Sequence, residues 1–115
     1  MVAYPLTSPA RPKMGIAAYQ QNHIAYASPA ELLLMVYDVA ISACGRRDHT
    51  RCKAAVVELI NSLNFEYPDV AVGLLRLYQY CLELTGKGQF DEVKDILSQL
   101  RATWAAAMAS QPAPK

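Results

Sequence analysis

Three side chains close together in the sequence have the residue types for metal or nucleophile chemistry: Cys44, His49 and Cys52. Cysteine and histidine are common zinc ligands, but a structural site needs four ligands, and this spacing matches no usual zinc-finger pattern. Asp48 could be the fourth ligand, although it is better placed to cap the helix that follows. His49 and Cys52 could form a nucleophile–base pair, but no third group is present to orient the base. We therefore expect neither a bound metal nor catalysis here.

The remainder of the sequence lacks the motifs of known enzyme sites. It contains no glycine-rich phosphate loop, no nucleophile elbow and no carboxylate pair with a basic partner. We therefore predict a protein that is not an enzyme and has no cofactor. Four cations, Arg46, Arg47, Arg51 and Lys53, surround one turn and could bind phosphate. A solvated helix junction is the simpler interpretation, because a net charge of +1 argues against binding nucleic acid.

The composition indicates an apolar and weakly charged domain. Of the 115 residues, 53% are hydrophobic and 18% are charged, whereas about 25% charged residues is usual. One domain of this size cannot bury so much apolar surface, and exposed apolar patches often mark interaction sites. No apolar run reaches the roughly 18–20 residues of a membrane span, and polar residues at 20–23 exclude a signal-peptide core. We expect a cytosolic protein with its three cysteines reduced.

Four helices must position these residues, and the sequence contains no convincing strand. Apolar periodicity and helix start and stop signals predict Pro29–Cys44, His49–Asn64, a helix from Pro68 to the glycines at 86 and 88, and Gln89–Ala109. Because the connections are short, we expect an all-α fold, an antiparallel up-down four-helix bundle. The bundle domain would span residues 14–109, with a capping segment at 14–27 and flexible tails at 1–13 and 110–115.

The first helix has a clear beginning and no obvious polar face. Ser28 can cap it, Pro29 stands at its first position, and Glu31 can complete a capping box with Ser28. Every residue from Leu32 to Tyr37 is apolar, whereas a surface helix normally keeps a polar face. This helix is therefore either surrounded by other helices or has an exposed apolar surface that binds a partner.

The third helix carries two adjacent apolar stripes. The first contains Val70, Leu74, Leu77, Cys81 and Leu84, and the second contains Leu75, Tyr78 and Leu82. Both stripes could be core, since a central helix touches two neighbours, or the second could line a binding groove. Periodicity alone leaves these two interpretations open.

Five segments of the chain, taken together and in order, resemble a known family. They are Ala18–Asn22, Ala27–Asp38, Ser62–Asn64, Leu74–Tyr80 and Leu100–Trp104. In this order they are similar to the FliS family of flagellar export chaperones, over residues 15 to 108. The resemblance implies a cytosolic antiparallel helical bundle of flagellated bacteria that binds the C-terminal segment of new flagellin. It would block flagellin polymerisation and help present flagellin to the export gate, with apolar helical faces entering a groove.

The resemblance also indicates candidate partner-binding residues. The family segment before the first helix folds onto the bundle, and here it corresponds to residues 15–19. Ile16 and Tyr19 could plug the groove until flagellin displaces them, or could simply anchor the tail. For the groove we choose the outer parts of the first and third helices: Leu32, Met35, Leu74, Leu75, Tyr78 and Leu82. Met35 suits an adaptable contact because its side chain is flexible and polarizable.

Two stretches, Ile41–Asn64 and Tyr80–Phe90, are shorter than expected for the family, by something like three and two turns of helix. Both connections lie at the same end of an up-down bundle. We therefore expect this distal end to be trimmed as a whole, which keeps neighbouring helices matched in length.

Two other functions remain open. The main alternative is a regulatory adaptor that binds another flagellar protein, such as an anti-sigma or translation-control component. A small redox or metal protein that uses Cys44, His49 and Cys52 is a more distant alternative. An uncovered apolar groove would also allow a homodimer, because the surface that binds flagellin could bind a second copy.

Overall fold

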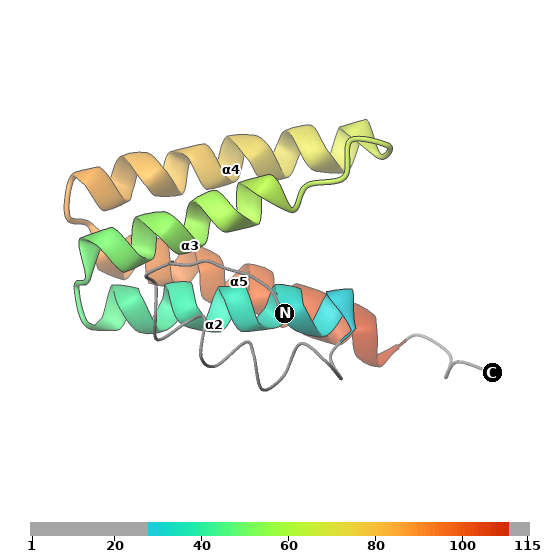
Figure 1. Cartoon of the computed structure of the whole chain (residues 1–115), viewed down its shortest axis with the longest axis horizontal. Helices are drawn as coiled ribbons and strands as arrows, with labels where there is room; N and C mark the ends of the chain where they lie inside the picture. Colours follow the sequence, from blue (N-terminus) through green and yellow to red (C-terminus); the bar gives the residue numbers. More distant parts are fainter. Residues whose placement is uncertain (1–27, 111–115) are drawn as a thin grey trace, which may run out of the picture. The chain divides into compact units, whose positions relative to one another are not determined.

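Figure 1 shows the computed structural model, which describes residues 28–110. These residues form four helices and no strand: α2 (Pro29–Gly45), α3 (His49–Asn61), α4 (Pro68–Gly86) and α5 (Phe90–Ala109). The prediction of an all-α four-helix fold is therefore confirmed. The expected tails and the capping segment at 14–27, including Ile16 and Tyr19, lie outside the described residues apart from Ser110. The chain divides after Leu32 into two compact units, and the packing described below is that of the second.

Successive helices of this second unit run in opposite directions (Figure 1). The connections 46–48 and 87–89 lie at one end of the bundle, and the connection 62–67 lies at the other. At the first end the Arg47 guanidinium lies 5.8 Å from the centre of the Phe90 ring and 3.8 Å from the Asp91 carboxylate. The two short connections therefore meet at one end, as the up-down topology predicts, and we call it the distal end.

The helix beginnings follow from local side-chain caps. The Ser28 N–H donates to Glu31 Oε1 at 2.8 Å, and the Glu31 N–H donates to Ser28 Oγ at 3.1 Å. These two bonds form the predicted capping box. Asp48 accepts a hydrogen bond from the Arg51 N–H at 3.1 Å and caps α3, as expected. Pro68 stands at the start of α4, where its missing N–H costs no helical hydrogen bond.

The end of α3 differs from the prediction, because this helix stops at Asn61 and not at Asn64. The Ser62 hydroxyl donates to the Leu59 carbonyl at 2.7 Å, and Asn64 Oδ1 accepts from the Glu66 N–H at 2.9 Å. Short polar side chains that bond nearby backbone in this way compete with helical hydrogen bonds and favour a turn. Smaller differences are that α2 includes Gly45 and that α5 begins at Phe90, after Gln89.

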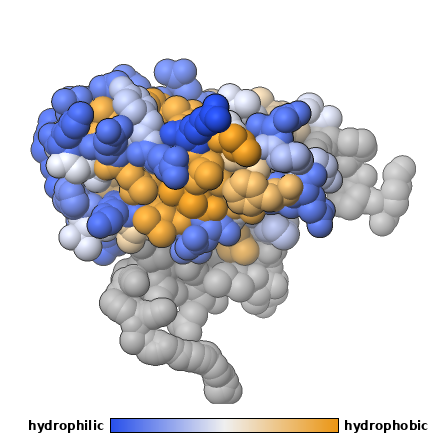
Figure 2. Space-filling view, turned by 90° about the horizontal axis from the view of Figure 1, so that it is seen from above, coloured by the Kyte–Doolittle hydropathy of each residue, from blue (hydrophilic) through white to orange (hydrophobic). Residues whose placement is uncertain are grey.

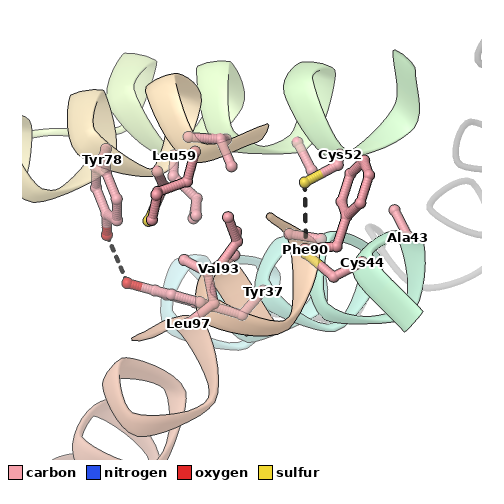
Figure 3. Close-up of a cluster of buried hydrophobic side chains, with 14 residues drawn as sticks. Tyr37, Ala43, Cys44, Cys52, Leu59, Tyr78, Phe90, Val93 and Leu97 are labelled. Carbon is pink, nitrogen blue, oxygen red and sulfur yellow. Dashed lines mark hydrogen bonds between the residues drawn. The ribbon is translucent and has the colours of Figure 1, made fainter. Parts of the chain in front are cut away.

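The core lies between the four helices and contains one continuous cluster of side chains (Figure 3). Its largest fully buried members include Tyr37, Tyr78, Leu59, Leu97, Val56 and Val93. Polar contacts add to this packing between α2 and α5, where Arg101 donates two hydrogen bonds to the Asp38 carboxylate at 2.6 and 3.2 Å. This pair is partly exposed, so it contributes much less to stability than the apolar cluster.

The inward face of α4 contains residues of both stripes that the sequence suggested and also two residues that belong to neither, Ala71 and Thr85. Ala71, Tyr78 and Thr85 are buried at spacings of seven residues, together with Cys81 and Leu84. Val70 of the first stripe is 57% exposed, although Cys81 and Leu84 of the same stripe are buried. Its exposure therefore goes with its place in the first turn of α4, and the buried face of the helix takes residues from both stripes.

Candidate partner-binding surface

The structure separates the residues that could have formed a metal or nucleophile site. Cys44 and Cys52 are buried with their sulfur atoms 3.4 Å apart, whereas His49 is exposed at the first residue of α3. Among residues 28–110, no group of three or more His, Cys, Asp and Glu side chains could hold a metal ion. Asp48 acts as the cap of α3. This cluster therefore lacks the arrangement that zinc or Cys–His chemistry would need.

Tyr78 belongs to the core and not to a groove on the surface. It is 1% exposed, and its hydroxyl lies 2.5 Å from that of Tyr37 (Figure 3). The Trp104 indole N–H donates to the Tyr37 hydroxyl at 3.0 Å, so one small network joins α2, α4 and α5. Burial raises the pKa of both phenols, and both therefore stay neutral. We leave Tyr78 out of the candidate surface, because a partner cannot reach it while the bundle is closed.

The other predicted groove residues that the structure describes are half-buried. Leu74 and Leu82 of α4 pack against the core and expose only part of their side chains. Leu75 of α4 and Met35 of α2 have intermediate exposure, as does Leu32, which belongs to the first unit. Ile16 and Tyr19 lie outside the described residues. These positions remain predictions for partner binding.

The strongest apolar exposure lies where we did not expect it, in the hairpin formed by α3 and α4. The large exposed apolar side chains of this hairpin, which we together call the α3–α4 hairpin surface, are Val57, Phe65, Tyr67, Val70 and Val72. Val70 and Val72 stand on different sides of α4, since residues two apart on a helix point about 200° apart. Phe65 is 55% exposed and Tyr67 is 66% exposed. Figure 2 shows hydrophobic atoms gathered in a continuous area on the side of the molecule formed by α4 and α3. A sequence signal was available, because a connection between helices is normally polar and this one carries two aromatic residues.

Charges of both signs stand near this surface. Glu58, Glu66 and Asp69 lie within the hairpin, and the exposed Lys53 and Arg76 stand one helical turn from Val57 and Val72. Tyr80, another exposed aromatic residue, is different because its hydroxyl donates to the Glu92 carboxylate at 3.0 Å on α5. The hairpin surface therefore offers apolar contact area with carboxylates and basic side chains at its edge and no catalytic group.

Comparison with known families identifies the chain. Residues 45–111, more than half of its length, match the family described as flagellar protein FliS. The chain belongs to the FliS family. The match contains α3, α4 and α5 with the whole hairpin surface, and it confirms the family that the sequence indicated. Of the five segments, those at 62–64, 74–80 and 100–104 lie inside it. No curated protein and no solved structure matched the chain.

Membership of this family fixes the general role. FliS is a chaperone family of the flagellum and not an enzyme family, so the protein has a flagellar chaperone role. Its expected partners are flagellar proteins. None of the helices α2 to α5 has the combination of length and apolar character that crossing a membrane requires.

Proposed function

We propose that this FliS protein binds the C-terminal helical segment of flagellin in the cytosol, holds flagellin as a monomer and supports its export. The observation that carries the proposal is the continuous hydrophobic area on the side formed by α3 and α4, two helices that lie inside the family match (Figure 2). Soluble monomers seldom leave large apolar side chains grouped in this way unless the group has a partner. An amphipathic flagellin segment supplies a matching apolar face.

The binding residues that we propose combine exposed and half-buried side chains. The exposed ones are those of the α3–α4 hairpin surface, and Leu74, Leu75 and Leu82 of α4 extend it. Met35 of α2 and Leu32 at its start would contact a longer bound segment. Ile16 and Tyr19, which lie outside the described residues, stay in the proposal as candidate partner-binding residues.

Burial of apolar side chains supplies enough free energy for this role. Covering one Leu-sized side chain contributes about 1.5–3 kcal/mol, whereas ordering a disordered segment costs about 2–5 kcal/mol or more. A few such contacts therefore offset the ordering cost. Because the apolar face of flagellin would be covered, polymerisation would be blocked by competition for that face, without a chemical step.

A polymerisation assay tests this proposal. Flagellin monomers from the same organism are added to short filament seeds, and elongation is followed by light scattering with increasing amounts of the protein. We expect elongation to stop near one molecule of the chaperone per flagellin, since each bound segment removes one monomer. Unchanged elongation at several-fold excess would contradict the proposal. The adaptor function would then become the better interpretation, with an anti-sigma or translation-control protein as the partner to test.

A further inference from the structure

Cys44 and Cys52 form a pair of thiols that the chaperone role does not use. Cys44 lies in the last turn of α2 and Cys52 in the first turns of α3, so the pair spans the connection 46–48. Their sulfur atoms are 3.4 Å apart, and both side chains are buried (Figure 3). A disulfide needs sulfur atoms about 2.05 Å apart, so a closure of little more than 1 Å would join them.

Hydrogen bonds fix the direction in which these thiols donate. The Thr85 hydroxyl donates its only hydrogen to the Cys81 carbonyl at 2.8 Å. The Cys52 sulfur lies 3.4 Å from Thr85 Oγ1, so the Cys52 thiol donates to Thr85. The Cys44 thiol is then left to donate to Cys52 Sγ. The hydrogen bond that the Cys44 thiol donates lowers the pKa of Cys52 to about 7, although burial acts in the opposite direction. The same hydrogen bond raises the pKa of Cys44.

We propose that Cys44 and Cys52 are a disulfide site, which a peroxide oxidant closes and a dithiol reductant reopens. One thiolate attacks a peroxide oxygen, the O–O bond breaks, and a sulfenic acid forms while the other oxygen leaves as water after taking a proton. The sulfur of the second cysteine then attacks the sulfenic sulfur. The S–O bond of the sulfenic acid breaks, and its hydroxide takes the proton of the second thiol and leaves as a second water. Two thiols and one hydrogen peroxide thus give one disulfide and two waters. In a reducing cytosol the resting state is the dithiol.

The pair is buried, so a small oxidant reaches it through local opening, which the position of the pair beside a helix connection favours over that of the third cysteine. Cys44 is next to Gly45 at a helix end, and Arg47 in the same connection has a positive φ of 55°. Helix ends and connections open locally more easily than helix centres. Cys81 is fully buried in the centre of α4, and burial raises the pKa of its thiol to about 12. The thiolate is the reactive form, so Cys81 serves as an internal control.

The test treats the full chain with hydrogen peroxide, blocks remaining thiols with N-ethylmaleimide in denaturant, and determines the linkage by tryptic digestion and mass spectrometry. We expect residues 14–46 linked to residues 52–53, with a mass lower by two hydrogen atoms, while Cys81 is recovered as a blocked thiol. Dithiothreitol should reverse the change. Because the bond closes a short loop between helices, we also expect the melting temperature to rise by roughly 5–10 °C.

Two variants separate this site from general thiol oxidation. Cys81→Ala should keep the linkage, and Cys52→Ala should lose it together with the rise in melting temperature. The same treatment in urea should give mixed pairings, since folding no longer holds the two sulfur atoms together. The proposal fails if Cys44 and Cys52 are both recovered as thiols or as sulfinic acids from the folded chain. It also fails if the folded chain shows the same mixture of pairings as in urea.

Discussion

Replacing Tyr78 by alanine should lower the free energy of unfolding by about 3–5 kcal/mol, as is typical for deletion of a buried aromatic ring. The ring is 1% exposed between α2, α4 and α5, and its hydroxyl is bonded to that of Tyr37. The substitution leaves a cavity and removes the hydrogen-bond partner that Tyr78 provides to the buried Tyr37 hydroxyl. Urea denaturation followed by circular dichroism measures the change.

Tyr80→Ala is the matched control, because it removes the same side chain two residues away on the exposed side of α4. Its cost should stay below about 1 kcal/mol. Tyr78→Phe keeps the ring and loses only the hydroxyl, so it should cost about 1 kcal/mol and remain folded if the alanine variant does not. Equal, small effects of Tyr78→Ala and Tyr80→Ala would contradict the assignment of Tyr78 to the core. A groove role for Tyr78 would then be restored.

Val72→Asp should weaken flagellin binding at least about tenfold, which corresponds to about 1.4 kcal/mol. Val72 is exposed on the α3–α4 hairpin surface, near the carboxylate-bearing residue Asp69. In the complex the new carboxylate would have to be buried against an apolar face, which costs free energy unless a cation pairs with it. The change in dissociation constant is measured by calorimetric titration with flagellin.

The control for this variant is Ala102→Asp, which places the same charge on an exposed position of α5. It should leave the dissociation constant for flagellin within about twofold of that of the original chain, because Ala102 lies outside the proposed binding surface. Both variants should unfold at temperatures close to that of the original chain. If Val72→Asp binds flagellin as tightly as Ala102→Asp does, the hairpin surface is not the binding site. The half-buried residues of α2 would then be the next candidates.

Local signals in the sequence predicted most of the fold, because helix beginnings depend on a few neighbouring residues. Ser28 with Glu31 and Asp48 formed the caps that their types and spacing indicated. The predicted end of α3 at Asn64 was wrong, because the side chains of Ser62 and Asn64 form hydrogen bonds with nearby backbone groups. The sequence alone does not decide between such turn bonds and one more turn of helix.

The candidate surface was harder to predict, because apolar residues of a helix have the same spacing in the sequence whether they pack in the core or bind a partner. On α4 the buried face takes Tyr78 from one stripe and Cys81 and Leu84 from the other, and packing against the other helices decides which members are covered. Val70 has the same direction as Cys81 but stands in the first turn of α4, where it is exposed. Phe65 and Tyr67 stand in a connection, where helical periodicity gives no information about exposure.

We propose that this FliS protein binds flagellin through the C-terminal segment of flagellin. The most direct measurement is calorimetric titration of the full chain with full-length flagellin monomer, beside the same flagellin without its C-terminal helical segment. We expect one-to-one binding to full-length flagellin and loss of detectable heat with the truncated form. Equal binding to both forms, or no binding to either, would contradict the claim.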